Sequence, residues 1–431
     1  KEPGQRLRFC FAFPDLYEIG MSHLGLHLMY QLLNERDDVF CERCFMPWSD
    51  FRRQLIDHAI DLHTLETKTS LREMDFIGFT LQYELSFTNI LEMLRLAHIP
   101  LFAEERKNGN FPLIVAGGPC VYNPEPIADF IDVFFIGESE ELAPEFLDLA
   151  RQYRLDDPTE KEAFLIAASK LEGIYVPRFY RPIYNEFGDL TGYHKEGDPE
   201  GTPAPKIRKR IVKDVDACFQ LTEPIVPFSD IVHDRAVAEI FRGCTRGCRF
   251  CQAGMIYRPI REKSVDTVMA NIDALITASG YDEVSLSSLS TLDYSRIEEL
   301  VSRLAETYGS SRTSISLPSL RMDAAAEDMS IRVLNKLQAV RKSGLTFAPE
   351  AGTQRLRDVI NKNVTERDIE ETFRKIFALG WFRVKLYFMI GLPTETELDL
   401  KGIEEIGNLA VYLFKQVKPE QMKKLAEVTI S

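Results

Sequence analysis

Three cysteines lie within eight consecutive positions of this 431-residue chain, at Cys244, Cys248 and Cys251. Thiolates spaced C-x3-C-x2-C on one tight loop can reach three corners of a cubane iron–sulfur cluster and leave the fourth iron open for a ligand. A structural zinc ion instead takes four ligands, and the nearest further candidate in the sequence is His233. The spacing therefore favours a [4Fe–4S] cluster, with a zinc-binding scaffold or three ordinary buried cysteines as the alternatives.

The residues between and around the cysteines suit a cluster-binding loop. Glycines let the backbone curl closely around a cluster without side-chain clashes, and they are Gly243, Gly247 and Gly254. Arginines would place positive charge near the ionised sulfurs or near an anionic ligand, and they are Arg242, Arg246 and Arg249.

Composition excludes several classes of protein. With 52 Lys and Arg against 66 Asp and Glu, the formal charge of -14 argues against a protein that coats nucleic acid or anionic membranes. The apolar stretches are far shorter than the roughly 18 residues that cross a bilayer. Eight cysteines are too few for a disulfide scaffold. We therefore expect a cytoplasmic protein that has no membrane partner.

The first third of the chain alternates short apolar runs with amphipathic stretches. Such alternation of strand and helix predicts a doubly wound, mostly parallel α/β sheet, which we assign to residues 1–150. The expected strands are 7–13, 39–45, 76–81, 113–116 and 133–136. Ligand-binding loops of such a sheet lie at the carboxyl ends of its strands.

A proline-rich stretch, residues 151–235, follows this sheet and predicts a hairpin with an extended connector. It contains the basic run 206–213, which is typical of a solvated strand face and is also the feature on which RNA binding would depend.

Residues 236–431 resume the βα alternation and predict a partial (β/α)6 barrel, which we expect to be truncated at its C-terminal end. The expected strands are 237–241, 283–286, 314–317, 345–348, 383–390 and 427–430, with helices at 265–277, 297–304, 331–337, 369–379 and 403–414. Active sites of α/β barrels lie at the carboxyl ends of the strands, and the cysteine loop follows the first of them.

The cysteine loop resembles the signature of the radical S-adenosylmethionine (SAM) superfamily, C-x3-C-x-aromatic-C, with Phe250 as the aromatic residue. The resemblance implies that the open iron is chelated by the amino and carboxylate groups of SAM. It also implies that an electron from the reduced cluster cleaves SAM and yields a 5′-deoxyadenosyl radical.

Other positions match the superfamily less tightly. Ser287 and Ser288 stand where members often carry Gly-Gly-Glu to hold the SAM amino group. Arg321 could pair with the methionine carboxylate, or it could be a solvent-facing arginine. Glu350, after the fourth strand, resembles a contact to the ribose or amino end of SAM. Gly391 resembles the adenine-side turn, although a Gly-x-Pro sequence can also be merely a turn.

The doubly wound domain in front of the barrel resembles the cobalamin-binding domain of one large branch of the superfamily. That domain carries Asp-x-His-x-x-Gly after its first strand, and this chain has Asp15, Tyr17 and Gly20 at those three positions. Tyrosine does not replace imidazole as a cobalt ligand, and His23 and His27 have the spacing of helix residues. Members of the branch without the histidine still bind cobalamin, with the lower face of the cobalt unligated.

Two later segments also look like this branch. Gly117 and Gly118 follow the fourth strand, and Glu138 follows the fifth, where glycine-rich backbone can approach a nucleotide tail. The alternative is a retained fold that only shapes the substrate channel. The lone pair Cys41 and Cys44 falls on opposite faces of an expected strand, which indicates structural thiols.

The sequence therefore predicts an enzyme of an uncharacterised radical SAM branch with a cobalamin-binding-like first domain. We expect SAM cleavage at a [4Fe–4S] cluster, with methyl transfer as the leading outcome if cobalamin is present. The alternatives are a non-catalytic metal-binding scaffold and an RNA-modifying enzyme that transfers methyl or methylthio groups. The RNA contacts of the latter would be the basic connector and the arginines around the cysteine loop, Arg242, Arg246, Arg249, Arg258 and Arg261. The substrate class is left open among small molecule, peptide and RNA, and a flavodoxin- or ferredoxin-like electron donor is expected.

Overall fold

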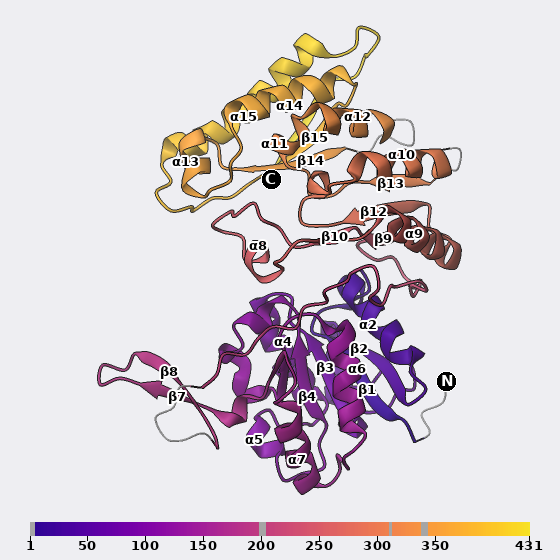
Figure 1. Cartoon of the computed structure of the whole chain (residues 1–431), viewed down its shortest axis with the longest axis vertical. Helices are drawn as coiled ribbons and strands as arrows, with labels where there is room; N and C mark the ends of the chain where they lie inside the picture. Colours follow the sequence, from indigo (N-terminus) through magenta and orange to yellow (C-terminus); the bar gives the residue numbers. More distant parts are fainter. Residues whose placement is uncertain (1–4, 198–203, 310–312, 338–343) are drawn as a thin grey trace. The chain divides into compact units, whose positions relative to one another are not determined.

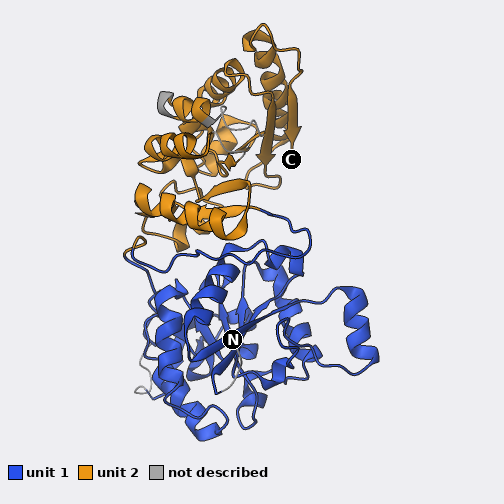
Figure 2. Cartoon of the chain, turned by 90° about the vertical axis from the view of Figure 1, so that its right-hand side faces the viewer, with its two compact units in different colours: residues 1–213, 217–234 blue, residues 214–216, 235–431 orange. Residues whose placement is uncertain are grey.

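The computed structural model describes residues 5–197, 204–309, 313–337 and 344–431. The chain divides into two compact units, residues 1–213 with 217–234, and residues 214–216 with 235–431 (Figure 2). Each unit is an α/β structure with its own sheets (Figure 1). Within the described residues, no helix is long and apolar enough to cross a membrane.

The described residues of the first unit form eight strands. They are β1 (Leu7–Phe13), β2 (Val39–Phe45), β3 (Phe76–Thr80), β4 (Leu113–Gly117), β5 (Val133–Phe135), β6 (Ile174–Tyr175), β7 (Tyr180–Tyr184) and β8 (Leu190–Lys195). Its α-helices are α1 (Tyr17–Gly20), α2 (Leu24–Glu35), α3 (Ser49–Asp57), α4 (Phe87–Leu96), α5 (Ala103–Arg106), α6 (Ser139–Ala150) and α7 (Pro158–Ala168).

The main sheet of this unit has the order β2-β1-β3-β4-β5-β6. Strands β1 to β5 pair in parallel, and β6 pairs with β5 antiparallel. The strand order reverses direction at β1, as it does in doubly wound folds. The predicted N-terminal fold class is confirmed.

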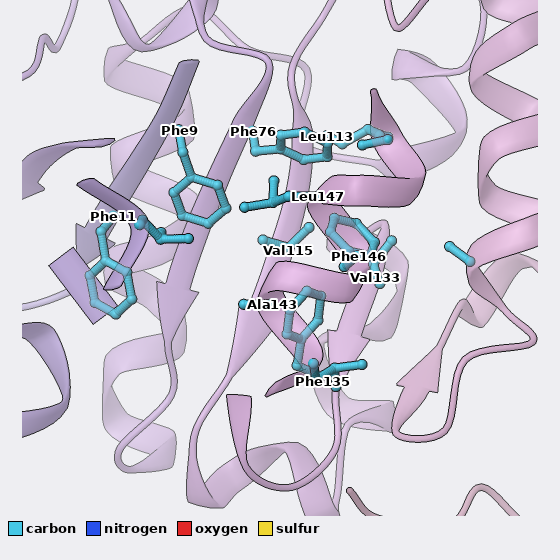
Figure 3. Close-up of a cluster of buried hydrophobic side chains, with 14 of the residues drawn as sticks. Phe9, Phe11, Phe76, Leu113, Val115, Val133, Phe135, Ala143, Phe146 and Leu147 are labelled. Carbon is cyan, nitrogen blue, oxygen red and sulfur yellow. The ribbon is translucent and has the colours of Figure 1, made fainter. Parts of the chain in front are cut away.

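Both faces of this sheet are covered by helices, so its strands are apolar on both sides. On one face, Phe9 and Phe76 pack with Phe146 of α6 (Figure 3). On the other face, Ile77 lies in a cluster with Ile90 of α4. Cys41 belongs to the first cluster and Cys44 to the second, so the two thiols lie on opposite faces, as the strand period predicts.

The connector returns to the edge of this sheet after the antiparallel hairpin β7–β8. Arg210 forms a parallel bridge with Gly137, just beyond β5, and its backbone exchanges hydrogen bonds with Ile136 and Glu138. Gly137 has φ +115°, and a Cβ there would collide with the Arg210 backbone. Glycine is therefore required here because the connector packs directly on the main chain.

The second unit contains eight strands and eight α-helices among its described residues. The strands are β9 (Ala236–Glu239), β10 (Phe241–Arg242), β11 (Arg261–Glu262), β12 (Glu283–Ser287), β13 (Ser314–Ser316), β14 (Leu345–Glu350), β15 (Arg383–Phe388) and β16 (Glu427–Ile430). The helices are α8 (Ala253–Ile256), α9 (Val265–Ser279), α10 (Ile297–Tyr308), α11 (Met322–Ala325), α12 (Asp328–Leu337), α13 (Gln354–Val359), α14 (Glu366–Ala378) and α15 (Glu397–Val417).

Six parallel strands of this unit follow one another in chain order. They form two three-stranded sheets, β9-β12-β13 and β14-β15-β16, and the parallel bridge between Leu320 and Phe347 connects them. Helices alternate with the strands, which confirms the predicted partial (β/α)6 arrangement. The loops at the carboxyl ends of these strands are where the chemistry of such a fold is expected.

One detail of the predicted barrel is wrong. The first strand was expected to run through Phe241, but β9 ends at Glu239 and Phe241 lies in a separate strand, β10. Strand β10 turns away because it pairs antiparallel with β11, Phe241 with Glu262 and Arg242 with Arg261. This short ladder closes the base of the cysteine loop.

Candidate active site

The cysteine loop is folded tightly at its start. Gly243 has φ +91°, and a Cβ there would lie 2.7 Å from the Pro259 carbonyl oxygen and 2.9 Å from that of Tyr257. Only glycine fits so close to the returning backbone. Arg258 donates from Nε to the Cys244 carbonyl oxygen at 3.3 Å, so the two sides of the loop are bonded directly above the β10–β11 ladder.

The segment after α13 holds the middle of the loop. The Arg249 amide donates to the Ile360 carbonyl at 2.9 Å, and Asn361 Nδ2 donates to the Gly247 carbonyl at 2.7 Å. Asn361 has φ +53°, a conformation that asparagine tolerates better than most residues. No local pattern in the sequence indicates Asn361, because its partner Gly247 lies 114 positions away.

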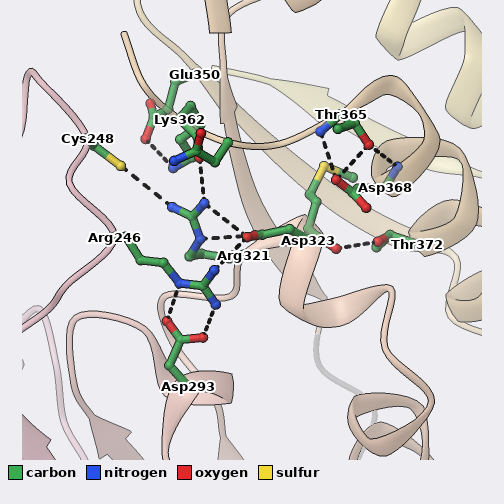
Figure 4. Close-up of polar contacts among 12 residues, drawn as sticks. Arg246, Cys248, Asp293, Arg321, Asp323, Glu350, Lys362, Thr365, Asp368 and Thr372 are labelled. Carbon is green, nitrogen blue, oxygen red and sulfur yellow. Dashed lines mark hydrogen bonds and ion pairs between the residues drawn. The ribbon is translucent and has the colours of Figure 1, made fainter. Parts of the chain in front are cut away.

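The loops after β12 and β13 hold the same loop through Arg246. Its guanidinium pairs with both carboxylate oxygens of Asp293, one of them at 2.8 Å from Nε, and with Asp323 Oδ2 at 3.0 Å (Figure 4). Burial of Asp293 opposes its ionisation, but hydrogen bonds from Arg246 and Ser290 together with the positive charges of Arg246 and Arg321 outweigh it, and the pKa of Asp293 is lowered. Arg246 therefore ties the loop to two neighbouring barrel strands.

Arg321 is not the solvent-facing arginine considered above, because it is only 7% exposed. It donates to both oxygens of Asp323, at 3.0 and 3.2 Å, and to the Lys362 carbonyl at 2.6 Å. Its Nη1 lies 3.6 Å from Sγ of Cys248, in hydrogen-bonding geometry (Figure 4). Arg321 thus contacts a cysteine of the candidate cluster site directly.

Glu350 ends β14 in a left-handed conformation, with φ +70°. Non-glycine residues in this region are strained and cluster at functional sites. The Glu350 carboxylate accepts a hydrogen bond from Lys362 Nζ at 3.2 Å, and that ammonium lies 5.9 Å from the centre of the Phe250 ring. The structure therefore brings together Glu350 and Phe250, with the buried Lys362, which the sequence did not indicate, between them.

The remaining predicted SAM residues also lie at carboxyl ends of strands. Ser287 is the last residue of β12, and the Ser288 hydroxyl lies 3.1 Å from that of Thr291, which donates to the Pro318 carbonyl after β13. Gly391 follows β15 in a turn closed by Glu395, whose carboxylate accepts from the Gly391 amide at 3.1 Å. These contacts shape the loops, and a role of the three residues in SAM binding stays a prediction.

The three loop cysteines differ from the others in their surroundings. All three are half-buried, whereas Cys10, Cys41, Cys44 and Cys120 are fully buried. Burial raises the pKa of Cys120 to about 11 and that of Cys10 well above its ordinary value, which keeps such thiols protonated and inert. The half-buried thiols are those of the loop and Cys218, and only the three of the loop lie on one segment.

The described residues contain no group of three or more His, Cys, Asp or Glu side chains arranged to hold a single metal ion. A zinc scaffold needs such a convergence. A cubane does not, because each thiolate binds a different iron at a different corner. Three cysteines spread along one curled loop suit the cubane better than a mononuclear ion.

The arginines around the loop make internal contacts, contrary to what an RNA-binding surface there would require. Arg242 pairs with Glu239 at 2.9 Å, Arg249 donates to the Val359 carbonyl at 2.6 Å, and Arg261 donates to the Pro259 carbonyl at 3.2 Å. In the first unit, a separate cavity of about 370 Å³ is lined by cations. These cations are Lys170, Lys195, Lys206 and Arg208. The RNA alternative now depends on this cavity.

In the first unit, most of the predicted cobalamin residues contact the protein itself. Tyr17 packs edge-on against the Phe45 ring, with centroids 5.1 Å apart, and Gly20 lies under the same ring. Gly117 accepts a hydrogen bond from the Leu81 amide at 2.7 Å, and Gly118 lies against the Leu81 backbone. The Glu138 carboxylate accepts from the Val212 amide of the connector at 2.6 Å.

Asp15 differs from these residues because it lies at the carboxyl edge of the sheet with a polar partner. Its carboxylate accepts a hydrogen bond from the Tyr83 hydroxyl at 2.6 Å. Large apolar side chains are exposed at the same edge, Trp48 after β2 and Leu85 after β3. This edge can therefore offer apolar and polar contacts to a large ligand.

The two histidines near β1 have structural roles. His23 caps α2 by accepting from the Leu26 amide at 3.3 Å, and burial lowers its pKa to about 4. His27 is buried, with Nε2 2.8 Å from the Met21 carbonyl and Nδ1 accepting from the Ile225 amide at 3.3 Å. Both nitrogens of His27 and Nδ1 of His23 are therefore engaged by the chain's own backbone.

Comparison with known proteins assigns the class of this chain. Residues 25–177 match the family described as "Radical SAM proteins, N-terminal", and residues 238–405 match the "Radical SAM superfamily". The chain belongs to the radical SAM superfamily and is an enzyme of that class. Membership implies SAM and a [4Fe–4S] cluster, and the donor set and loop geometry described above fit such a cluster.

Several proteins resemble the chain over most of its length. An uncharacterized protein of Methanocaldococcus jannaschii is 29% identical over 94% of this chain and 74% of its own length. The ribosomal protein uS12 methylthiotransferase RimO of Thermotoga maritima is 21% identical over 60% of this chain and 64% of its own length. The radical SAM methyltransferase TsrM of Kitasatospora setae, solved with cobalamin and a [4Fe–4S] cluster, shares the fold. The two structures align with a TM-score of 0.60 over 95% of this chain and 73% of TsrM, at 12% sequence identity.

Proposed function

We propose that this protein cleaves SAM reductively at a [4Fe–4S] cluster held by Cys244, Cys248 and Cys251, and uses the resulting radical on a substrate. The observation that carries the proposal is the loop itself: its three half-buried thiols are fixed by bonds to the loops after β12, β13 and β14. When bound and reduced, a cluster held by these cysteines would supply the single electron that cleaves the SAM sulfonium into methionine and a 5′-deoxyadenosyl radical.

The residues around the loop have separate tasks. Arg246 and Asn361 fix the loop backbone so that the three sulfurs are presented together. Glu350 ends β14 beside the loop, and Lys362 holds its carboxylate, which places an acceptor for the SAM ammonium or ribose hydroxyls. Phe250 offers an apolar ring at the loop surface for the adenosyl part.

Anaerobic reconstitution with iron and sulfide tests this function. We expect a broad visible absorption, and conversion of SAM to methionine and 5′-deoxyadenosine in equal amounts when a one-electron reductant is added. The natural donor is proposed to be a flavodoxin- or ferredoxin-like protein. Absence of iron and sulfide after reconstitution, with zinc bound in their place, would instead support the metal-binding scaffold.

A second proposal concerns the first unit, which we infer binds cobalamin for methyl transfer. It is supported by the fold shared with TsrM, whose structure contains cobalamin, and by the apolar and polar side chains at the carboxyl edge of β1, β2 and β3. The contacts of Gly118 and Glu138 with the chain itself do not fit the tail contacts expected from the sequence, so the ligand would depend on Asp15, Trp48 and Tyr83 instead.

Electron paramagnetic resonance of the Co(II) form tests this second proposal. Because His23 and His27 are held by the Leu26, Met21 and Ile225 backbone, we expect a spectrum without nitrogen splitting from a protein imidazole. Trp48→Ala should weaken binding of added hydroxocobalamin, and Phe51→Ala, another exposed aromatic residue, should not. If the anaerobically purified protein retains no cobalamin, even after reconstitution, the second proposal is wrong and the first unit only shapes the substrate channel.

A further inference from the structure

Arg321 uses most of its hydrogen-bond donors on its own chain. An arginine has five N–H donors, and four of those in Arg321 are used by the two Asp323 oxygens, the Lys362 carbonyl and Cys248 Sγ. The Nε–Nη2 edge holds the Asp323 carboxylate and the second Nη2 hydrogen goes to the Lys362 carbonyl, so no edge is left to hold another carboxylate in bidentate geometry. Pairing with the SAM carboxylate would require Asp323 to leave.

Asp323 is itself fixed on its other side. Its Oδ2 accepts from Arg246 Nη1 at 3.0 Å, and Arg246 is held by Asp293. Aspartate and arginine side chains therefore alternate in a hydrogen-bonded network that begins at Asp293 and ends at the Cys248 sulfur (Figure 4). Two arginines and two aspartates balance in charge, so the network fixes geometry without adding net charge to the site.

The contact with sulfur has an electronic consequence. Hydrogen bonds to cluster thiolates are among the factors that set the reduction potential of iron–sulfur clusters. A charged donor at 3.6 Å stabilises negative charge on the sulfur, and reduction adds negative charge to the cluster. The buried position of Arg321 strengthens this effect because little water screens it.

We propose that Arg321 is a positioning residue that holds Cys248 and raises the reduction potential of the cluster, and that it does not bind the SAM carboxylate. The inference rests on the proposed function, because it requires the cluster at Cys248. The two can be tested separately, because the reduction potential of the cluster can be measured without turnover of SAM.

The test compares Arg321→Gln and Arg321→Lys with the parent in the reconstituted protein without SAM. We expect the midpoint potential from a reductive titration to be more negative in Arg321→Gln, with Arg321→Lys between it and the parent. Arg296→Gln removes the same charge from an exposed helix end, where the side chain pairs with Glu299, and the midpoint potential of this variant should equal that of the parent. The SAM dissociation constant of Arg321→Gln should change by less than about tenfold, the loss expected for a bidentate ionic contact.

Two other results would contradict either the role of Arg321 or the proposed function. A tenfold or greater loss of SAM affinity with an unchanged potential would identify Arg321 as a carboxylate ligand and overturn the inference. Failure of the parent itself to form a cluster would refute the proposed function instead.

A measurement on the parent alone covers the case in which neither variant folds. Protein made with ¹⁵N-guanidino arginine should show a ¹⁵N hyperfine coupling to the reduced cluster in pulsed electron paramagnetic resonance. Lack of that coupling would contradict the contact between Arg321 and Cys248.

Discussion

Replacing Cys248 by serine is expected to abolish the iron–sulfur cluster and, with it, SAM cleavage. A serine hydroxyl stays protonated at neutral pH and is a poor iron ligand, so one corner of the cubane loses its thiolate. Because the three ligands act as a unit, the rate of 5′-deoxyadenosine formation should fall by about 100-fold or more, as for other groups that work together. Iron and sulfide content and the visible absorption measure the cluster directly.

Cys218→Ser provides the matched control. Cys218 is also half-buried, but it lies in the first unit and outside the loop. Its replacement should leave iron, sulfide and SAM cleavage at the parent values. Equal loss in Cys218→Ser and Cys248→Ser would indicate general oxygen damage or misfolding and would count against the assignment of the ligands.

Replacing Arg357 by methionine is expected to produce a large loss of stability. Arg357 is fully buried, and its guanidinium donates to the Val364 carbonyl at 2.8 Å and to the Ala351 carbonyl at 3.1 Å. These two carbonyls flank the segment that carries Lys362. Methionine fills similar volume but leaves both acceptors unsatisfied, so the free energy of unfolding of the second unit should fall by about 3 kcal/mol.

The measurement needs a reporter of the second unit alone. The chain has two tryptophans, Trp48 in the first unit and Trp381, which is buried, in the second. In a Trp48→Phe background, urea unfolding followed by fluorescence therefore reports the second unit. Arg367→Met, which removes an exposed arginine paired only with Glu371 on the same helix, should leave the midpoint unchanged. A similar shift in both variants would show that the buried contacts of Arg357 contribute little.

The strands and the cysteine loop could be predicted from the sequence because they depend on local patterns. The apolar run 7–13 forms β1 with the same bounds, and the spacing of the three cysteines places them on one loop at the end of the first barrel strand. Strand ends were less predictable. The break after Glu239 depends on the pairing of Phe241 with Glu262, and no local signal marks that pairing.

The sequence alone indicated which chemical groups the candidate site contains, because three thiolates, an aromatic residue and an acid at the end of β14 can be recognised by residue type and spacing. The sequence did not indicate which residues those groups contact. Arg321 contacts Cys248 across 73 positions and the Lys362 carbonyl across 41, and Gly137 meets Arg210 of the connector. Which charges neutralise one another and which glycines face the chain's own backbone depend on contacts between distant segments, and only the tertiary structure brings those segments together.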